Sequence, residues 1–594
     1  MCGIVGYLGN NQAQPILFDC LARLEYRGYD SCGIAIADDG LELCKDAYRV
    51  GIMAKRTPPH KGVLGVGHTR WATCGEPSMQ NAHPHTDCSG SIAVVHNGII
   101  SNFKELKQQL VKEGHCFVSE TDTEVIPHLI EKYYQGNLET AMERALGDIR
   151  GSYAIAAIKA GEEKLVVARQ DSPLVIGVGD HESFVASDVP AVLEHTNRII
   201  YLEEGDIGII TAADIKIKRD GDYAELKEHK ISWSIKEAQK AGYEHFMLKE
   251  IHEQPRVVRD TLVGYCKEAE PINDLELMRD TGIEDMLILA CGTSYNAGLV
   301  GKYVFEELLR IPIRVELASE FNYYPHTLAK TMAIVITQSG ETADVIHAAR
   351  RLQEAGCRVL AITNVVGSTI SRLANQTIYT SAGPEISVAS TKSFMAQLVL
   401  LYWLVMSYSR ADIKRLADMM LQIRQIPSKV QQVLDNKQGI EKCAKYLANY
   451  ENVFFIGRGV NYPIALEGAL KMKEISYIHA EGYAAGELKH GPFALLGRDT
   501  PVVAIVAKDN TFDAVINNIR EIKTRNAPVI AISEDDDGVV NEVSDFVITV
   551  PSVDYIFSPI VNTVALQLLA YYTAKERGCP IDFPRNLAKS VTVE

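Results

Sequence analysis

The sequence predicts a multidomain protein in which an α+β sandwich is followed by two α/β domains, each with a parallel sheet. At 594 residues the chain is too long for one hydrophobic core, and we expect three to four domains of about 150 residues each. Up to about residue 210, short alternating strands are interrupted by a few helices, which indicates a layered α+β domain. The C-terminal half contains two similar copies of a strand–turn–helix–strand pattern, which is typical of parallel sheets. We place the domains at residues 1–235, 236–250 (a linker), 251–430, 431–580 and 581–594 (a tail).

The net charge, the apolar segments and the cysteines indicate which partners and which compartment to expect. The net charge of −16 disfavours nucleic acids and anionic membranes as partners. The N-terminus has no signal-peptide pattern, and the longest apolar run, Leu398 to Met406, is shorter than the roughly 20 residues that span a membrane. The 12 cysteines show no paired metal-ligand spacing, so we expect reduced thiols, a cytoplasmic protein and no bound metal.

The elements of the N-terminal third follow from alternating hydrophobicity and from helical periodicity. We expect strands over Ile4–Tyr7, Gly33–Ala37, Gly65–His68, Ile92–His96, Tyr153–Lys159, Lys164–Ala168 and Ile207–Thr211. We expect helices over Pro15–Arg23, Asn102–Glu113 and Thr123–Tyr134.

Cys2 directly follows the initiator methionine, so removal of Met1 leaves a thiol and a free α-amine on one residue. The ordinary pKa of that amine, about 7.7–8.0, lets it act as a base near neutral pH, and a base beside a thiol makes an activated nucleophile. The alternative is that Cys2 is an ordinary buried apolar residue.

Four polar clusters accompany Cys2 in the same third of the chain, where ends of strands and loops hold working residues. They are Leu24–Ser31, His68–Thr73, His96–Ile99 and Ser119–Glu124. Each also has a structural alternative: a turn at Asn97-Gly98, a helix N-cap at Thr121 or Asp122, an ion pair at Arg70 and a core aromatic at Trp71. Together with Cys2 they match amide hydrolysis, which needs a nucleophile, an oxyanion hole and a clamp for the substrate's charged ends.

On these blocks, residues 1–220 resemble the class II (N-terminal nucleophile) glutamine amidotransferase domain. The resemblance implies a four-layer sandwich in which Cys2 attacks the carboxamide of L-glutamine and carries a glutamyl thioester. It assigns the oxyanion hole to Asn97 and Gly98, a type of donor whose loss costs about 10²–10³ in rate. By the same resemblance Arg70 holds the α-carboxylate, Asp122 the α-ammonium, Thr73 and His83 line the pocket, and Trp71 gates an ammonia channel.

One position departs from this family's pattern. Cys74 stands where many members carry histidine, so we expect at most a backbone contact with glutamine from this residue. Nearby, the segment Asn81–His85 holds two histidines but no carboxylate or third ligand at suitable spacing, and we predict no metal there.

Charged residues between the two halves, from Asp214 to Gln254, lack strong periodicity. We expect a last hairpin of the first domain around Lys216–Asp222 and a boundary near residues 235–245. A helix should begin within Met247–Pro255.

The two copies in the C-terminal half differ in their loops. In copy one, Thr337–Thr342 opens a helix after a buried strand, and hydroxyls with free N–H groups at a helix N-terminus form an anion site. Copy two has Asp509 in the matching loop, which would repel phosphate. We therefore predict that copy one binds phosphate through Thr337, Gln338, Ser339 and Thr342, with help from Thr293, Ser294, Ser390 and Lys392. The alternative is that these hydroxyls only cap helices.

Copy two and the tail hold residues suited to isomerising a ketose phosphate. Glu467, Lys471 and Glu474 share one helical face, although this spacing is also typical of a surface ion-pair ladder. The reaction needs a lysine that forms a Schiff base with C2, a carboxylate that moves a proton between C1 and C2, and a histidine that opens the sugar ring.

This half resembles a tandem pair of sugar isomerase (SIS) domains, and the whole chain is similar to the glutamine–fructose-6-phosphate aminotransferase family. The resemblance gives the three roles above to Lys589, Glu474 and His490, with Lys471 assisting. It implies D-fructose 6-phosphate as acceptor, glucosamine 6-phosphate as product at the first step of the hexosamine pathway, and no cofactor. Because the family's histidine serves the neighbouring subunit, we expect a homodimer. Thr337 stands where the family has serine and keeps the hydroxyl.

Three alternatives stay open to experiment. The same glutaminase could serve another phosphosugar, which substrate screening would reveal. The SIS copies could form a regulatory sugar-phosphate sensor, but the chain shows no helix-turn-helix or basic face, and a sensor does not account for Cys2. An amidophosphoribosyltransferase shares the first domain type but needs an acidic phosphoribosyl-binding loop, which we do not find.

Overall fold

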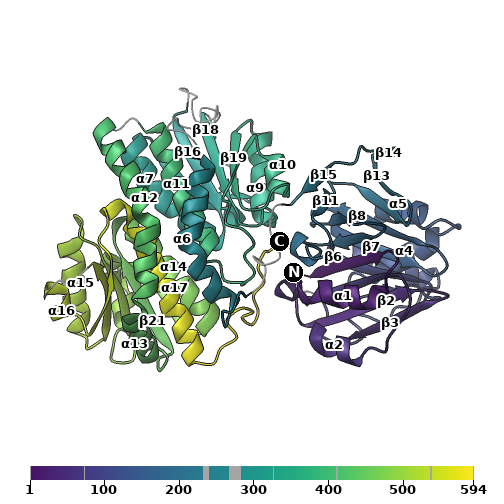
Figure 1. The fold of residues 1–594 in the computed structure, drawn as a ribbon, viewed down its shortest axis with the longest axis horizontal. Helices are drawn as coiled ribbons and strands as arrows, with labels where there is room; N and C mark the ends of the chain where they lie inside the picture. The colour runs from purple at the N-terminus through teal and green to yellow at the C-terminus, as the bar shows by residue number, and fades with distance from the viewer. Residues whose placement is uncertain are drawn as a thin grey trace. The chain divides into compact units, whose positions relative to one another are not determined.

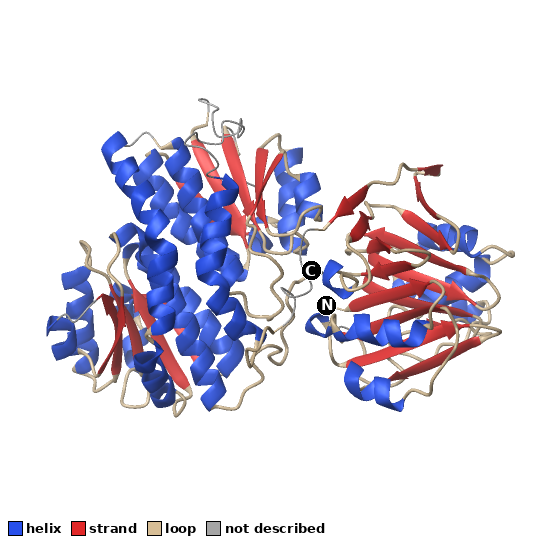
Figure 2. Cartoon of the chain, viewed as in Figure 1, coloured by secondary structure: helices blue, strands red, loops and turns tan. Residues whose placement is uncertain are grey.

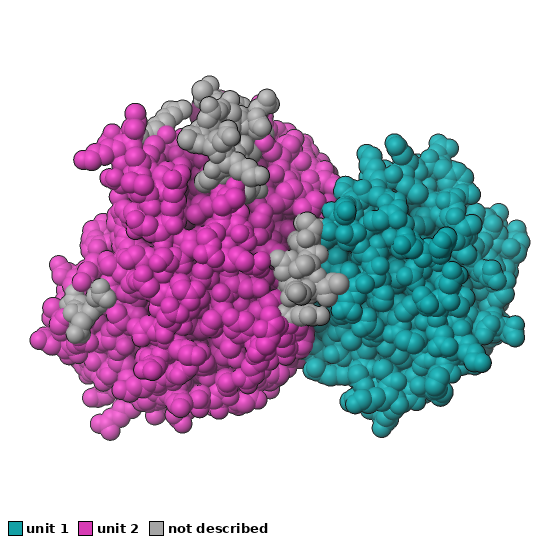
Figure 3. Space-filling model, in the orientation of Figure 1, with its two compact units in different colours: residues 1–238, 341–343, 588–594 teal, residues 239–340, 344–587 magenta. Residues whose placement is uncertain are grey.

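The structure is a computed structural model that describes residues 2–72, 74–231, 240–265, 283–324, 327–328, 330–409, 412–534 and 538–592. The chain forms two compact units, which are described separately (Figure 3). Unit 1 comprises residues 1–238, 341–343 and 588–594, and unit 2 comprises residues 239–340 and 344–587.

Unit 1 is built on two antiparallel sheets. The first has eight strands in the order β15 (Glu228–Lys230), β11 (Arg198–Tyr201), β9 (Val175–Val178), β10 (Ser183–Ala186), β1 (Gly3–Leu8), β4 (Leu64–Arg70), β2 (Ser31–Ala37) and β3 (Leu41–Asp46). The second has seven strands in the order β14 (Asp222–Tyr223), β13 (Ile215–Arg219), β12 (Ile207–Thr211), β8 (Lys164–Gln170), β7 (Gly151–Lys159), β6 (Ile92–Ile100) and β5 (His85–Thr86).

The two sheets pack face to face between layers of helices (Figures 1 and 2). Successive side chains of a strand point to opposite faces of the sheet, so each strand contributes to two hydrophobic cores. On β6, Val95 joins the core between the sheets, whereas Ile92 and Val94 join the core under the helices. Helices α1 (Ala13–Ala22) and α2 (Val50–Arg56) accompany the first sheet, and α3 (Phe103–Lys112), α4 (Val125–Tyr133) and α5 (Leu138–Asp148) the second. The predicted four-layer sandwich is therefore confirmed.

The predicted strands and helices of this unit all form, with ends shifted by a few residues. One alternative was wrong: Asn97-Gly98 does not make a turn but lies inside β6. Helix α5 was missed from the sequence, although Asn137 marks its start, because its side chain accepts the backbone N–H groups of Glu139 and Thr140. Strands β13 and β14 form the expected hairpin.

Unit 2 contains two five-stranded parallel sheets. The first runs in the order β17 (Ile313–Leu317), β16 (Asp285–Ala290), β18 (Thr331–Ile336), β19 (Arg358–Thr363) and β20 (Gln376–Tyr379). The second runs in the order β22 (His479–Ala484), β21 (Asn452–Gly457), β23 (Val502–Val506), β24 (Val529–Glu534) and β25 (Phe546–Val550). Numbered within each copy, both orders read second, first, third, fourth, fifth, which confirms the internal repeat of α/β domains.

Helices join the two sheets of unit 2 into one core. The helices that contribute to it are α6 (Phe246–Tyr265), α7 (Gly292–Leu309), α11 (Lys392–Tyr408), α12 (Ile413–Asp435), α13 (Lys437–Leu447), α14 (Tyr462–Ser476) and α17 (Ser558–Glu576). Smaller helices complete the copies: α8 (Ala318–Phe321), α9 (Ala343–Glu354), α10 (Thr369–Leu373), α15 (Phe512–Lys523) and α16 (Gly538–Val543).

Two apolar helical segments are core elements of unit 2. The run Leu398–Met406 lies in α11 with every residue buried, as predicted. Among the described residues, one helical stretch, Tyr555–Glu576, is long and apolar enough to cross a membrane, and 94% of its apolar window is buried inside the protein.

Candidate active sites

Cys2 lies at the start of β1, where three other segments of unit 1 reach it. The backbone N–H of Trp71 donates to Cys2 Sγ at 3.2 Å. Asn97 Nδ2 and Arg27 Nε donate to the backbone oxygen of Cys2 at 3.0 and 3.3 Å. Because β1 pairs with β4, Trp71 at the end of β4 is brought beside Cys2, while Asn97 comes from β6 of the other sheet.

A buried histidine fixes the orientation of the Asn97 side chain. His68 Nε2 lies 3.0 Å from Asn97 Oδ1 and 3.0 Å from the backbone oxygen of His96. Both partners are acceptors, so Nε2 carries the proton and donates. Burial lowers the pKa of His68 to about 3, so the ring is neutral. With Asn97 Oδ1 held by His68, its Nδ2 must point toward Cys2.

Gly98 follows in a backbone conformation that favours glycine, with φ of +130°. A Cβ at this position would lie 2.1 Å from the backbone oxygen of Ser152 on the neighbouring strand β7. The β6 backbone therefore requires glycine beside Asn97.

Arg70 and Asp122, the predicted glutamine clamp, both hydrogen-bond to the backbone of unit 1. Arg70 is buried, and its Nη2 donates to the backbone oxygens of Cys74 and, at 3.1 Å, Gly75. Asp122 Oδ2 accepts the backbone N–H of Ile100 at 2.8 Å and does not cap α4, which excludes the N-cap alternative for this residue. Burial lowers the pKa of Arg70, whereas the negative charge of Asp122 acts to raise it. The two side chains therefore interact electrostatically.

The rings of His83 and Trp71 each pack against another aromatic ring of unit 1. The ring of His83 stacks on His68, with 4.1 Å between the ring centroids. Burial lowers the pKa of His83 well below its usual value, so the His83 ring is neutral. Trp71 meets the ring of Tyr29 edge-on at 5.8 Å. Thr73, predicted to line the pocket, lies outside the described residues.

The Cys2 thiol is not ionised by its surroundings alone. Burial raises its pKa above the ordinary value, while the hydrogen bond from Trp71 and the charges of Arg70 and Arg27 act in the opposite direction. A thiol in this state needs a base to become a nucleophile.

Sequence reasoning missed the role of Arg27 and Asp188. Arg27 is only 4% exposed, and its Nη1 lies 2.9 Å from Asp188 Oδ2, which also accepts the hydroxyl of Tyr26 at 2.6 Å. The pair anchors Arg27 against the backbone of Cys2. The signal was present in the polar cluster Leu24–Ser31, but its partner lies more than 150 residues away in the sequence.

The second site forms in unit 2, where α14 of copy two meets α7 of copy one. Lys471 Nζ lies 2.5 Å from Glu474 Oε2 and 3.5 Å from Glu467 Oε1, and it donates to Thr293 Oγ1 at 3.0 Å. Asn296 Nδ2 donates to Glu467 Oε2 at 2.8 Å. The side chains of Glu467 and Lys471 are 2% and 1% exposed, so this is not a surface ion-pair ladder.

The charges of this cluster depend on one another. Burial raises the pKa of Glu467 to about 7, although Lys471 and Asn296 act against this rise. Burial alone would lower the pKa of Lys471, but Glu474 and Glu467 together raise it above the ordinary value. Lys471 is therefore held as a cation beside two carboxyl groups, one of which titrates near neutrality.

The hydroxyl-rich loop Thr337–Thr342 connects β18 to the 12-residue helix α9, as predicted. Gly340 has φ of +70°, and a Cβ there would lie 2.1 Å from Ser368 Oγ. Its N–H donates to Thr337 Oγ1 at 3.3 Å, which ties the loop together. Gln338 and Ser339 lie between these two residues.

The remaining predicted phosphate ligands lie in or beside helices. Ser294 Oγ, in the first turn of α7, accepts Gln397 Nε2 of α11 at 3.0 Å. Ser390 lies two residues before α11. Lys392 is fully buried, and its Nζ lies 2.7 Å from Glu253 Oε2, so this cation is already paired with a carboxylate.

The last two predicted residues lie outside helix α14. His490 is exposed at the end of the 3₁₀ helix η6 (Ala485–His490). Lys589 belongs to the tail that is part of unit 1, whereas Glu474 belongs to unit 2.

Comparison with known proteins identifies the family. The glutamine amidotransferase domain family matches residues 68–194, and the SIS domain family matches residues 283–407 and 446–577. A glutamine–fructose-6-phosphate aminotransferase (isomerizing) of Methanosarcina mazei is 49% identical over the full length of both chains, and one of Methanothermobacter thermautotrophicus is 48% identical with the same coverage. The chain belongs to the glutamine–fructose-6-phosphate aminotransferase (isomerizing) family. It is therefore an enzyme.

Solved structures agree with this family for the C-terminal half. The C-terminal domain of glucosamine-fructose-6-phosphate aminotransferase from Francisella tularensis covers 58% of this chain and 100% of its own length, with 37% identity and a TM-score of 0.56. A putative tagatose-6-phosphate ketose/aldose isomerase from Clostridium novyi, at 19% identity and a TM-score of 0.50, shares the fold of this half.

Proposed function

We propose that this aminotransferase converts L-glutamine and D-fructose 6-phosphate to L-glutamate and D-glucosamine 6-phosphate. The names of its full-length relatives support this substrate pair. The observation that carries the proposal within this chain is the Asn97 amide, which His68 orients so that Nδ2 faces Cys2. An amide donor fixed in this way suits an oxyanion that develops on a carbonyl attacked by Cys2.

The first half-reaction hydrolyses glutamine. After removal of Met1, the α-amine of Cys2 takes the thiol proton, and Sγ attacks the side-chain carbonyl carbon of glutamine. The carbonyl electrons move to the oxygen, which Asn97 Nδ2 and the Gly98 N–H stabilise, while Arg70 and Asp122 hold the α-carboxylate and α-ammonium. Collapse of this intermediate expels ammonia, which leaves with the proton from the α-amine, and water then releases glutamate from the thioester.

The second half-reaction uses ammonia at the α14 cluster. The loop Thr337–Thr342 holds the sugar phosphate, His490 opens the ring, and Lys589 forms a Schiff base with C2. Ammonia displaces Lys589 at C2, and Glu474 moves a proton from C1 to C2, which leaves an amine on C2 and an aldehyde at C1. Lys471, held by Glu467 and Glu474, assists with its positive charge.

Several further features are proposed with this activity. Ammonia passes to the second site through a channel that Trp71 gates, and the enzyme is a homodimer in which the exposed His490 serves the partner's site. The product enters the hexosamine pathway, and the enzyme works in the cytoplasm without a redox cofactor. The domain boundaries given above are retained as part of the proposal.

The isomerase assignment can be tested by hydrogen exchange. Wild-type enzyme in D₂O should place deuterium on C1 of fructose 6-phosphate, detected by NMR, without glutamine. Glu474→Gln should slow this exchange by about 10²–10⁴ because the proton carrier is lost, and glutaminase activity should persist. The control Glu481→Gln, on β22, should exchange at the wild-type rate. Unchanged exchange in the Glu474 variant would refute the role of this carboxylate.

A further inference from the structure

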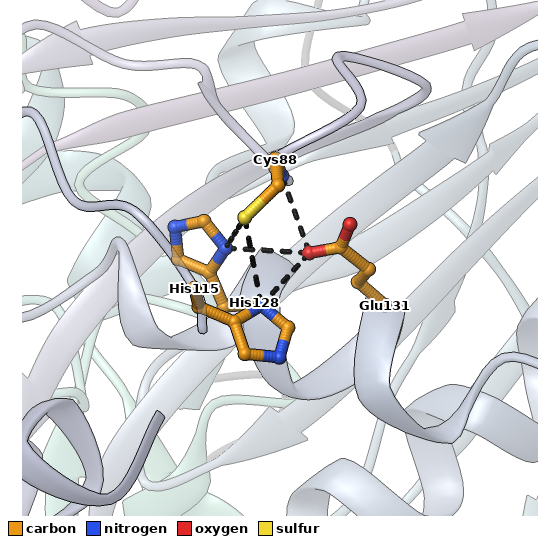
Figure 4. A group of neighbouring side chains, drawn as sticks. All are labelled: Cys88, His115, His128 and Glu131. Carbon is orange, nitrogen blue, oxygen red and sulfur yellow. Dashed lines mark hydrogen bonds and ion pairs between the residues drawn. The ribbon is translucent and has the colours of Figure 1, made fainter. Parts of the chain in front are cut away.

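Four potential metal ligands converge in unit 1, and none of them is among the predicted active-site residues. Figure 4 shows the side chains of Cys88, His115, His128 and Glu131 pointing toward one another. Cys88 follows β5, His115 follows α3, and His128 and Glu131 lie about one turn apart on α4. One ligand atom of each residue lies within 4.8 Å of all the others.

Three separations between these atoms lie close to the edges of a tetrahedral metal site, whereas the separation between His115 and Glu131 is shorter. Cys88 Sγ lies 3.6 Å from His115 Nδ1 and 3.5 Å from His128 Nδ1. Glu131 Oε2 lies 2.9 Å from His115 Nδ1 and 3.5 Å from His128 Nδ1. Around tetrahedral zinc, with bonds of about 2.3 Å to sulfur and about 2.0–2.1 Å to nitrogen and oxygen, the S–N edges are about 3.5 Å and the N–O edges about 3.3 Å.

The groups behind the ligands are arranged as around known metal sites. His128 is 1% exposed, and its Nε2, which faces away from the cluster, is buried without a hydrogen-bond partner in the described structure. The nearest carboxylate oxygen, Glu124 Oε1, lies 3.9 Å from this Nε2. A carboxylate behind the second ring nitrogen is the usual support of a metal-bound histidine. On the other side, the backbone N–H of Cys116 donates to Cys88 Sγ at 3.4 Å, which suits a thiolate.

We propose that Cys88 Sγ, His115 Nδ1, His128 Nδ1 and a carboxylate oxygen of Glu131 form a structural Zn²⁺ site. Thiolate and imidazole donors in a tetrahedron favour zinc over magnesium or calcium. The thiolate and the carboxylate balance the two positive charges of the ion, and binding releases the thiol proton to solvent. Four protein ligands leave no open position, so the ion stabilises rather than catalyses.

The site would tie two loops to α4. Cys88 and His115 lie on segments without regular structure, whereas His128 and Glu131 lie on a packed helix. The segment between His115 and His128 includes Asp122, so the ion would also stiffen the loop that carries this residue. This proposal departs from the sequence prediction of no metal, because its four residues are 27, 13 and 3 positions apart and share no recognisable motif.

Metal content of the full-length enzyme tests this proposal. Wild-type protein loaded with Zn²⁺ and desalted should retain about one zinc per chain by elemental mass spectrometry. Cys88→Ser and His115→Gln should bind zinc at least about tenfold more weakly and lose it on desalting, because each removes one of four ligands. Cys44→Ser, a thiol elsewhere in unit 1, should retain zinc as the wild type does.

Two measurements distinguish a cluster that binds a metal ion from one that is held together only by hydrogen bonds. Co²⁺ in place of zinc should give the visible bands of a tetrahedral thiolate site in wild type and in Cys44→Ser but not in Cys88→Ser. Chelation should lower the melting temperature of wild type and leave that of Cys88→Ser unchanged. A wild type that retains no zinc, or a Cys88→Ser that retains as much as wild type, would overturn the proposal.

Discussion

Replacement of Asn97 by alanine should selectively disable glutamine hydrolysis. The Asn97 Nδ2 donor, 3.0 Å from the Cys2 backbone oxygen, is removed, while the nucleophile and the clamp remain. Loss of one such donor costs about 10²–10³ in kcat, or about 2.7–4 kcal/mol of transition-state stabilisation. The change should disturb folding little, because His68 Nε2 keeps its second acceptor, the backbone oxygen of His96, at 3.0 Å.

The assay compares two activities of the same preparation. Glutamate release from glutamine should fall by about 10²–10³ with a nearly unchanged KM for glutamine, since the donor acts mainly in the transition state. Amino-sugar synthesis from free ammonia should stay within about twofold of wild type, because it bypasses Cys2. A glutaminase rate within about fivefold of wild type would refute the oxyanion role of Asn97, and an equal loss of both activities would indicate misfolding instead.

Three further predictions concern stability and binding. Gly98→Ala should lower the free energy of unfolding of unit 1 by at least about 2 kcal/mol in chemical denaturation, because its Cβ would lie 2.1 Å from the Ser152 oxygen; wild-type stability would contradict this. Burial raises the pKa of Glu467 from 4.5 to about 7, so the folded enzyme binds more protons than the unfolded chain between these values and loses stability as the pH rises through them. Glu467→Gln should remove that loss in thermal unfolding, and an identical pH profile for variant and wild type would exclude the effect. Lys392→Met should destabilise unit 2, and adding Glu253→Gln should restore part of the stability with little change in the KM for fructose 6-phosphate. A KM raised more than about tenfold in both variants would instead favour the predicted phosphate contact.

Periodicity predicted the fold well because most elements of this chain bury one face. The strands of unit 1 alternate between two cores, and the repeated α/β pattern gave both sheets of unit 2. Helix α5 was missed although its four buried residues, Leu138, Ala141, Met142 and Ala145, follow amphipathic helical spacing. Periodicity also could not place Asn97-Gly98, because this dipeptide is common in turns but here lies inside a strand, with a positive φ at Gly98.

The site was predicted in part, and the missing residues share one cause. Cys2, Asn97 and Arg70 stand in recognisable blocks, so their motifs could be found. His68 orients Asn97 only through a contact between two sheets, and Arg27 depends on Asp188 far along the chain. Such partners depend on strand order, which no local pattern contains.

The same limit applies to unit 2. The spacing of Glu467, Lys471 and Glu474 gave their shared face but not the burial of Glu467 and Lys471, to which the contact of α14 with α7 contributes. The phosphate contact of Lys392 stays a prediction, and its local sequence did not reveal the ion pair with Glu253 of α6.

In the proposed reaction, Cys2 releases ammonia from glutamine, and the same enzyme transfers this nitrogen to an amino sugar. Amide-¹⁵N glutamine and fructose 6-phosphate should be incubated with wild type and Cys2→Ala, and the product analysed by mass spectrometry. We expect ¹⁵N-glucosamine 6-phosphate from wild type, even with excess unlabelled ammonium present. Cys2→Ala should make no labelled amino sugar, and with free ammonia it should make only the unlabelled product. Glutamate without an amino sugar would contradict the assignment of the acceptor, and no glutamate from wild type lacking Met1 would contradict the role of Cys2.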